Sequence, residues 1–112
     1  MDKIKDDHYY ATKIRDDFQF IIDQTKALTK QEIVQNEILL DSIMFRLIQV
    51  SENSLKLSAK FKTDFKVIPW SALKGLRNRI VHDYGNVDYR VIYDTVKDEI
   101  PVCLAELNRI LG

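Results

Sequence analysis

Apolar residues recur at helical spacing along most of the chain, and glycine and proline are scarce, so the pattern predicts an all-α protein. The first apolar stripe predicts a helix from about Lys3 to Lys26, with Ile4, Ala11, Ile14, Phe18, Ile21 and Ile22 on its inner face. Thr29-Lys30-Gln31-Glu32 fits a capping box, in which the side chains of Thr29 and Glu32 each bind the other residue's backbone N–H. A second helical segment should start there.

The next helix is predicted from about Glu37 to Phe61, and it is apolar on more than one side. Its apolar positions include Ile38, Leu40, Ile43, Met44, Phe45, Leu47 and Ile48. A surface helix needs only one apolar stripe, so we expect this one to pack against two neighbours, one of which could be another subunit. Glu52 falls in line with apolar positions of the same helix. We expect its carboxylate at the edge of the core, with pairing to a motif arginine as the alternative.

A loop is expected from Lys60 to Lys66, and Pro69 then suits the first turn of a further helix, where its missing N–H costs little. Trp70 is expected to anchor that helix in the core. Gly75, inside this helix, would allow close approach of another helix or of a phosphate. Gly85 is expected to end the helix in the left-handed conformation.

The last helix should be capped by Asn86 or Asp88 and should keep one apolar phase to Leu111. The phase continues past Pro101, which predicts one helix kinked there rather than two separate helices. The predicted fold is therefore an up-and-down bundle of four or five helices, with residues 1–112 as one domain.

Composition excludes several classes of protein. The chain is 46% hydrophobic and 30% charged, which is typical of a soluble globular protein, and no apolar run approaches the roughly 18 residues of a membrane span. The charged N-terminus has no apolar signal region, so we expect a cytoplasmic protein without a membrane partner. Cys103 is the only cysteine, so it predicts neither an internal disulfide nor a metal site.

The net charge is zero, but basic residues gather in one segment. Between Ser54 and Arg79 the only acid is Asp64, and the lysines are Lys56, Lys60, Lys62, Lys66 and Lys74. From charge alone we favour a solvated face that keeps the protein soluble. The alternative is a surface that attracts a nucleic-acid backbone independently of sequence.

The segment from Leu73 to Gly85 holds the only candidate catalytic constellation, Arg77-x4-His82-x-Tyr84. An Arg-x4-His pair alone is common by chance, and its plain interpretation is an ion-pairing arginine and a surface or capping histidine. On a helix, Arg77 and His82 would diverge by about 140° and lie about 7.5 Å apart along the axis. They would therefore not converge on one phosphate within a monomer, although two copies related by a two-fold axis could converge.

The long motif and its flanks resemble the HepT-like proteins, a branch of the HEPN superfamily. The flanking matches are Ile68-Pro69-Trp70, Val87-Asp88, Thr95-Val96-Lys97 and Ile100-Pro101. The resemblance covers most of the chain and implies a HEPN-like helical bundle that forms a homodimer with both motifs in one cleft. The sequence departs from the commoner family pattern at three places. Asp83 stands where glycine is frequent, Gly85 stands where an aromatic residue is frequent, and Ser51-Glu52-Asn53 stands where Gly-Glu-Ala is usual.

The reaction implied is RNA cleavage through the ribose 2′-OH, without a metal or another cofactor, with tRNA as a reasonable target. His82 would be the general base or acid, since the ordinary pKa of histidine lies near neutral pH. Arg77 would neutralise the phosphoryl oxygens with its planar fork of donors. Asn78 could orient a phosphate or the histidine ring, and Arg79 could add a phosphate contact or be a surface ion-pairing residue. The lysines of the basic segment would attract the RNA backbone.

Tyr84 could stack a base. The resemblance implies a more specific role in a type VII-like toxin–antitoxin system, in which a minimal nucleotidyltransferase of the MntA type transfers AMP to the tyrosine at this position. The bulk and charge of the adenylate would then obstruct the cleft. The competing hypothesis is a non-catalytic accessory subunit that binds nucleotide or substrate, through Arg77 and the basic segment, and presents it to such a nucleotidyltransferase.

Overall fold

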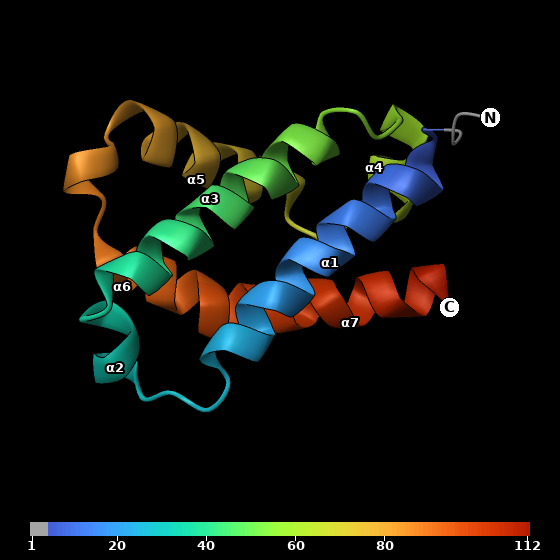
Figure 1. Ribbon diagram of the computed structural model, residues 1–112. Helices are drawn as coiled ribbons and strands as arrows, with labels where there is room; N and C mark the ends of the chain where they lie inside the picture. The colour runs from blue at the N-terminus through green and yellow to red at the C-terminus, as the bar shows by residue number, and fades with distance from the viewer. Residues whose placement is uncertain (1–4) are drawn as a thin grey trace.

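The computed structural model describes residues 5–112, and this part of the chain contains helices and connecting turns only (Figure 1). The elements are α1 (Asp7–Thr25), α2 (Lys30–Val34), α3 (Glu37–Ser54), α4 (Ala59–Asp64), α5 (Trp70–His82), the 3-10 turn η1 (Tyr84–Asn86), α6 (Tyr89–Asp94), the π-helical segment η2 (Thr95–Glu99) and α7 (Ile100–Leu111). The predicted all-α bundle is confirmed. The predicted helical positions Lys3 and Ile4 lie outside the described residues.

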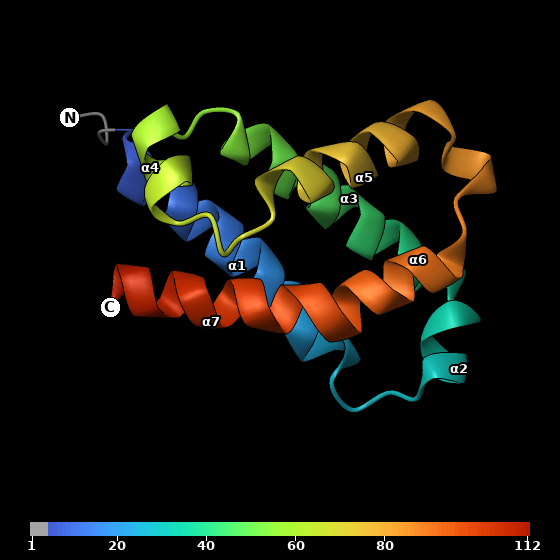
Figure 2. The ribbon, with the colours of Figure 1, turned by 180° about the vertical axis from the view of Figure 1, so that it is seen from behind.

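The helices form two layers, with α1 and α3 in front of α5 and the α6–α7 run in Figure 1. Seen from behind, α5 and α7 lie nearest the viewer (Figure 2). The long helix α3 packs against both α1 and α5, so its predicted burial against two neighbours is confirmed, and both neighbours belong to this chain. Its buried side chains are Leu40, Ile43, Met44, Leu47 and Val50.

Local caps fix where several helices begin. The predicted capping box is confirmed, because the Thr29 backbone N–H donates to Glu32 Oε1 at 2.9 Å and the Glu32 N–H donates to Thr29 Oγ1 at 3.1 Å. Asn36 caps α3 by accepting from the Leu39 N–H at 3.0 Å. The helix therefore begins at Glu37, as the sequence predicts.

The prediction of one helix from Glu37 to Phe61 followed by a loop is wrong. Helix α3 ends at Ser54, and α4 begins at Ala59. Ser58 starts α4, because its Oγ accepts from the Phe61 N–H at 3.1 Å. Ser58 also donates to the Asp7 carboxylate from its backbone N–H at 2.8 Å and from its Oγ at 2.6 Å, which ties the start of α4 to α1.

The last helical run starts at Asp88, whose carboxylate accepts from the Arg90 N–H at 2.9 Å. It continues as one run through α6, η2 and α7 (Figure 2). The run changes to π geometry directly before Pro101, and the Ile100 N–H donates to the Thr95 carbonyl. Proline has no N–H and its ring would clash with a carbonyl four residues earlier, and a π segment relieves both problems. The prediction of one run past Pro101 rather than two separate helices is confirmed, and the run departs from α geometry at Thr95–Glu99.

The predicted inner phase of the last run is kept on both sides of the π segment. The predicted positions Val96, Ile100, Leu104 and Leu107 are buried, and the other predicted positions, Tyr89, Tyr93 and Leu111, are partly buried against the core. Within residues 5–112, no helix combines the length and the apolar character that crossing a membrane requires.

Candidate functional site

The motif lies on α5, whose inner face is fixed by three buried side chains, Leu73, Leu76 and Ile80. Pro69 precedes the helix, and its carbonyl accepts from the Leu73 N–H at 3.0 Å, so the predicted place of the proline is confirmed to within one residue. Trp70 packs against the core as predicted, with its ring 6.3 Å from that of Phe61. These contacts hold α5 along α3.

Arg77 is held against α3 by Glu52. Its Nε donates to Glu52 Oε1 at 3.0 Å and its Nη2 lies 2.8 Å from the same oxygen. Its Nη1 donates to the side-chain oxygen of Asn78 at 3.1 Å. The expectation that Glu52 only marks the edge of the core is wrong, and the alternative, pairing with a motif arginine, is what the structure shows. Since a guanidinium carries five N–H donors, at least two remain for a ligand.

His82 is the last residue of α5, and its side chain is exposed. Within residues 5–112 it makes no hydrogen bond or ion pair, whereas Arg77 faces α3. The two side chains thus share no contact, in agreement with their predicted divergence around the helix. The imidazole is therefore open to solvent.

The end of α5 differs from the prediction at Gly85. Asp83 caps the helix with φ −142°, and the 3-10 turn Tyr84–Asn86 follows, held by a hydrogen bond of 2.9 Å from Asn86 Nδ2 to Asp83 Oδ1. Within the described residues only Gly112 has a positive φ, so the expected left-handed Gly85 is wrong. The polar contact within the turn replaces the glycine cap.

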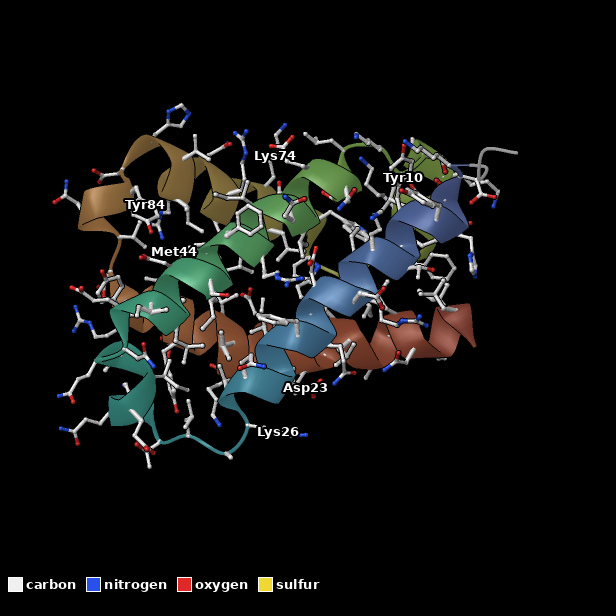
Figure 3. All side chains as sticks on the ribbon, viewed as in Figure 1. Tyr10, Asp23, Lys26, Met44, Lys74 and Tyr84 are labelled. Atoms are coloured by element: carbon white, nitrogen blue, oxygen red, sulfur yellow. The ribbon has the colours of Figure 1, made fainter. Side chains whose placement is uncertain are left out.

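The turn places Tyr84 against α3, at the end of the molecule where the chain leaves α5 (Figure 3). The Tyr84 hydroxyl donates to the carboxylate of Asp41. This hydrogen bond, with partial desolvation and the negative charge of Asp41, raises the pKa of Tyr84. Asp41 lies outside the predicted motif. The available signal was that Asp41 is the only acid between Glu37 and Glu52 on an apolar helix.

Arg79 lies on a different side of α5 from Arg77, because residues two positions apart on a helix point about 160° away from each other. It lines a pocket of about 310 Å³ between α5 and the start of α6, with Leu76, Asp83, Asn86, Val87, Asp88 and Val91. Gly75 lies farther along the same side of α5, and a Cβ built on it would meet nothing within 4 Å in this chain. The helix approach considered for Gly75 is therefore not made within the described chain.

The predicted RNA-binding lysines are not gathered at the motif within one chain. Lys60 pairs with Asp64 at 2.6 Å, and the Lys56 ammonium lies 5.6 Å from the Tyr10 ring, at the end of the molecule opposite Tyr84 (Figure 3). Lys62 and Lys66 also lie in or beside α4. Only Lys74 is on the motif helix. Within residues 5–112, no group of three or more His, Cys, Asp or Glu side chains is placed to hold a metal ion.

Comparison with known proteins assigns the family. Residues 14–110 match the family model described as Ribonuclease HepT-like. The chain belongs to the HepT-like ribonuclease family. It is 26% identical over 102 residues to a provisionally named RNase of Caldanaerobacter subterraneus subsp. tengcongensis, covering 91% of each chain.

Two archaeal relatives extend this similarity. A provisionally named RNase of Methanocaldococcus jannaschii is 28% identical over 88 residues, or 79% of this chain and 81% of that one. A protein named as a probable ribonuclease HepT from Thermococcus cleftensis is 26% identical over 101 residues, or 90% of this chain and 92% of that one. No solved structure gives a significant match. The HepT-like assignment therefore rests on sequence along nearly the whole chain.

Proposed function

We propose that this HepT-like protein is a metal-independent RNA endonuclease that acts as a homodimer in the cytoplasm. One observation carries the proposal. On a single helix of a HepT-like chain, the Arg77 guanidinium is held in a fixed orientation by Glu52, while the His82 imidazole is exposed and has no partner in the described residues. A fixed cation and a free acid–base group are the two elements that cleavage of RNA through the 2′-OH requires.

In the proposed reaction, the imidazole of His82 removes the proton of a ribose 2′-OH. The 2′-oxygen attacks the adjacent phosphorus, the bond from phosphorus to the 5′-oxygen breaks, and the leaving oxygen takes up a proton. A cyclic phosphate and a free 5′-hydroxyl result. Arg77 neutralises the charge that develops on the phosphoryl oxygens, and Asn78 supports the arginine through the contact to Nη1.

Arg77 and His82 of one chain do not converge on one phosphate, and in the proposed homodimer a second copy brings such side chains together. Helix α3 leaves Ile38 and Phe45 exposed by 84 and 56%, and its C-cap residue Leu55 is exposed by 53%. Ile38 and Phe45 are seven residues apart, so they share one face of the helix, and Glu52 continues the same line. Large apolar side chains exposed along one line are typical of an interaction surface. Docking two copies through this α3 face would bury the line and bring both Arg77 side chains toward the shared cleft.

The proposed biological role is that of the toxin in a toxin–antitoxin pair. The Tyr84 side chain is 50% exposed beside the motif, so a partner enzyme can reach it. A minimal nucleotidyltransferase of the MntA type would transfer AMP to its hydroxyl and so add bulk and negative charge at the mouth of the cleft. Arg79, and the lysines of a second copy, would attract the RNA backbone, and this attraction should weaken with salt.

The proposal is tested by RNA cleavage in the presence of EDTA. The wild-type protein is compared with His82→Ala, and His8→Ala is the matched control because His8 is the other exposed histidine. We expect wild type and His8→Ala to cleave tRNA alike, His82→Ala to be at least about 10²-fold slower, and a DNA oligonucleotide of the same sequence to stay intact. No cleavage of tRNA or other RNAs by unmodified, dimeric wild type would support the accessory subunit instead.

A further inference from the structure

The contact between Tyr84 and Asp41 joins the motif to a helix that the Arg-x4-His-x-Tyr pattern does not include. Tyr84 lies in the turn after α5, and Asp41 lies 43 residues earlier on α3. The tyrosine hydroxyl is the donor and the carboxylate is the acceptor. Among the described residues, the groups that act electrostatically on the phenol are Asp41 and, from the start of α6, Tyr89.

We propose that Asp41 holds the Tyr84 hydroxyl in the unmodified protein and acts as the general base that takes its proton during nucleotidyl transfer to Tyr84. The inference rests on the proposed AMP transfer to this tyrosine. It adds a residue of this chain to a reaction whose other groups belong to the partner enzyme. Asp41 is exposed in the described chain and lies at the edge of the α3 face proposed to meet a second copy, so the nucleoside triphosphate would reach the same hydroxyl at the mouth of the cleft.

The proposed AMP transfer uses the hydrogen bond between the Tyr84 hydroxyl and Asp41. The Tyr84 oxygen attacks the α-phosphorus of ATP, a new bond forms between that oxygen and phosphorus, and the bond to the β-phosphate breaks so that pyrophosphate leaves. The hydroxyl proton must be lost as the new bond forms. Asp41 already accepts the hydrogen bond made by that proton, so its carboxylate can take the proton and release it to solvent. The attacking oxygen therefore need not become a free phenolate beforehand.

The product cannot keep the contact. The adenylylated tyrosine has no hydroxyl proton to donate, and its phosphodiester carries a negative charge beside the Asp41 carboxylate. The negative phosphodiester and the negative Asp41 carboxylate repel each other, so the modified side chain should leave α3. Without the hydroxyl tether, the hydrogen bonds of the turn Tyr84–Asn86 within the described residues are the two from Asn86 to Asp83, one from the side chain and one from the backbone N–H. Modification would thus both add the adenylate and release the end of the motif segment from α3.

The first test needs no partner enzyme. The Tyr84 phenol is titrated by NMR with 13C-labelled tyrosine, and Tyr84→Phe identifies its resonance among the five tyrosines. We expect the pKa of Tyr84 to be lower in Asp41→Asn than in wild type, because the negative acceptor that favours the neutral phenol is gone. Glu37→Gln is the matched control, since it removes the same charge from an exposed position of α3. An equal pKa in all three proteins would overturn the inference.

The second test measures the transfer itself, with a minimal nucleotidyltransferase of the MntA type, magnesium and ATP, followed by intact mass. We expect Asp41→Asn to be modified about 10²-fold more slowly than wild type and Glu37→Gln at the wild-type rate. The ratio of the wild-type rate to the Asp41→Asn rate should fall about tenfold for each unit of pH from 6 to 8, because the variant must wait for the phenolate. Asp41→Glu should restore part of the rate.

The outcomes separate the two proposals. If wild type and Asp41→Asn are modified equally fast with the same pH profile, Asp41 has no role in the transfer, and the proposed AMP transfer to Tyr84 stands. If wild type gains no adenylate but still cleaves RNA through His82, the regulatory part of the proposed function fails together with this inference, and the ribonuclease remains.

Discussion

Arg77 and Glu52 form the contact that joins the motif helix α5 to α3, with both Nε and Nη2 of the arginine within 3.0 Å of Glu52 Oε1. The pair is not sealed in the core, since 29% of the Arg77 side chain and 45% of the Glu52 side chain are exposed. Exposed ion pairs contribute little to stability, and their medians lie near 0–1 kcal/mol. The consequence of this pair is therefore the orientation of the guanidinium rather than the stability of the bundle.

Because the pair orients Arg77 but adds little stability, we expect Glu52→Ala to lower the activity and to leave the stability nearly unchanged. We expect the free energy of unfolding in urea to change by less than ~1 kcal/mol. We expect the single-turnover rate of RNA cleavage to fall about tenfold, because an untethered Arg77 no longer meets the phosphoryl oxygens in one orientation. Glu37→Gln, at an exposed site on the same helix, should change neither quantity. A variant that cleaves at the full rate would show that Glu52 does not orient the arginine.

The proposed dimer predicts a difference between two apolar residues of nearly equal exposure. Phe45 on α3 is 56% exposed and Val102 on α7 is 54% exposed. Replacing either with glutamate should alter the folding of one chain little, since both sites face solvent. We expect Phe45→Glu alone to shift the protein to monomer in light scattering and to reduce RNA cleavage at least about tenfold, because a charge would be buried against the second copy. Matching behaviour of the two variants would exclude the α3 face.

Short-range signals explain what the sequence could predict of this fold. The capping box at Thr29, the cap at Asp88 and the irregularity at Pro101 each depend on residues within a few positions of one another. The inner phase of the last run is likewise local. Such features follow from helical spacing and side-chain chemistry without knowledge of the tertiary structure.

The features that sequence reasoning missed depend on distant partners. Ser58 is bound by Asp7, 51 positions earlier, and this contact fixes the start of a new helix, α4, where the sequence predicted one helix continuing to Phe61. Tyr84 is bound by Asp41, 43 positions earlier. The motif itself could be recognised from the sequence. Of the contacts that orient its side chains, the pairing of Glu52 with a motif arginine was only the alternative and the contact of Tyr84 with Asp41 was missed, because helical phase does not say which acids of α3 face α5.

Burial of Cys103 predicts slow thiol chemistry. The side chain has no exposed surface, and desolvation, with the nearby charge of Glu99, raises the pKa of the Cys103 thiol to about 11. At pH 8 the thiolate fraction should therefore be ~10²-fold lower in the folded protein than in the unfolded chain, where an ordinary cysteine has a pKa near 8.5. We expect the reaction with Ellman's reagent to be slower by at least this factor in buffer than in guanidinium. Rapid labelling of the native protein would show that the N-terminal half of α7, which holds Cys103, opens.

The contact between Asp7 and Ser58 predicts a pH-dependent contribution to stability. Hydrogen bonds from the Ser58 side chain and backbone lower the pKa of Asp7, so the folded state favours the carboxylate. A lowered folded-state pKa contributes stability above the unfolded pKa, and this contribution is lost as the pH falls through the folded pKa. We expect Asp7→Ala to lower the free energy of unfolding at pH 7 by about 1 kcal/mol. The difference from wild type should shrink below about pH 4.

Urea unfolding of both proteins at pH 7, 5 and 3 measures this difference. Asp23→Ala is a suitable control, because Asp23 lies near the other end of α1. Within residues 5–112 its carboxylate binds only the side chains of Gln19 on that helix and of the cap residue Lys26. A difference for Asp7→Ala that stays constant from pH 7 to pH 3 would mean that the Asp7 carboxylate does not hold the start of α4 in solution. A difference that disappears with protonation would establish that α4 is tied to α1 through this one charge.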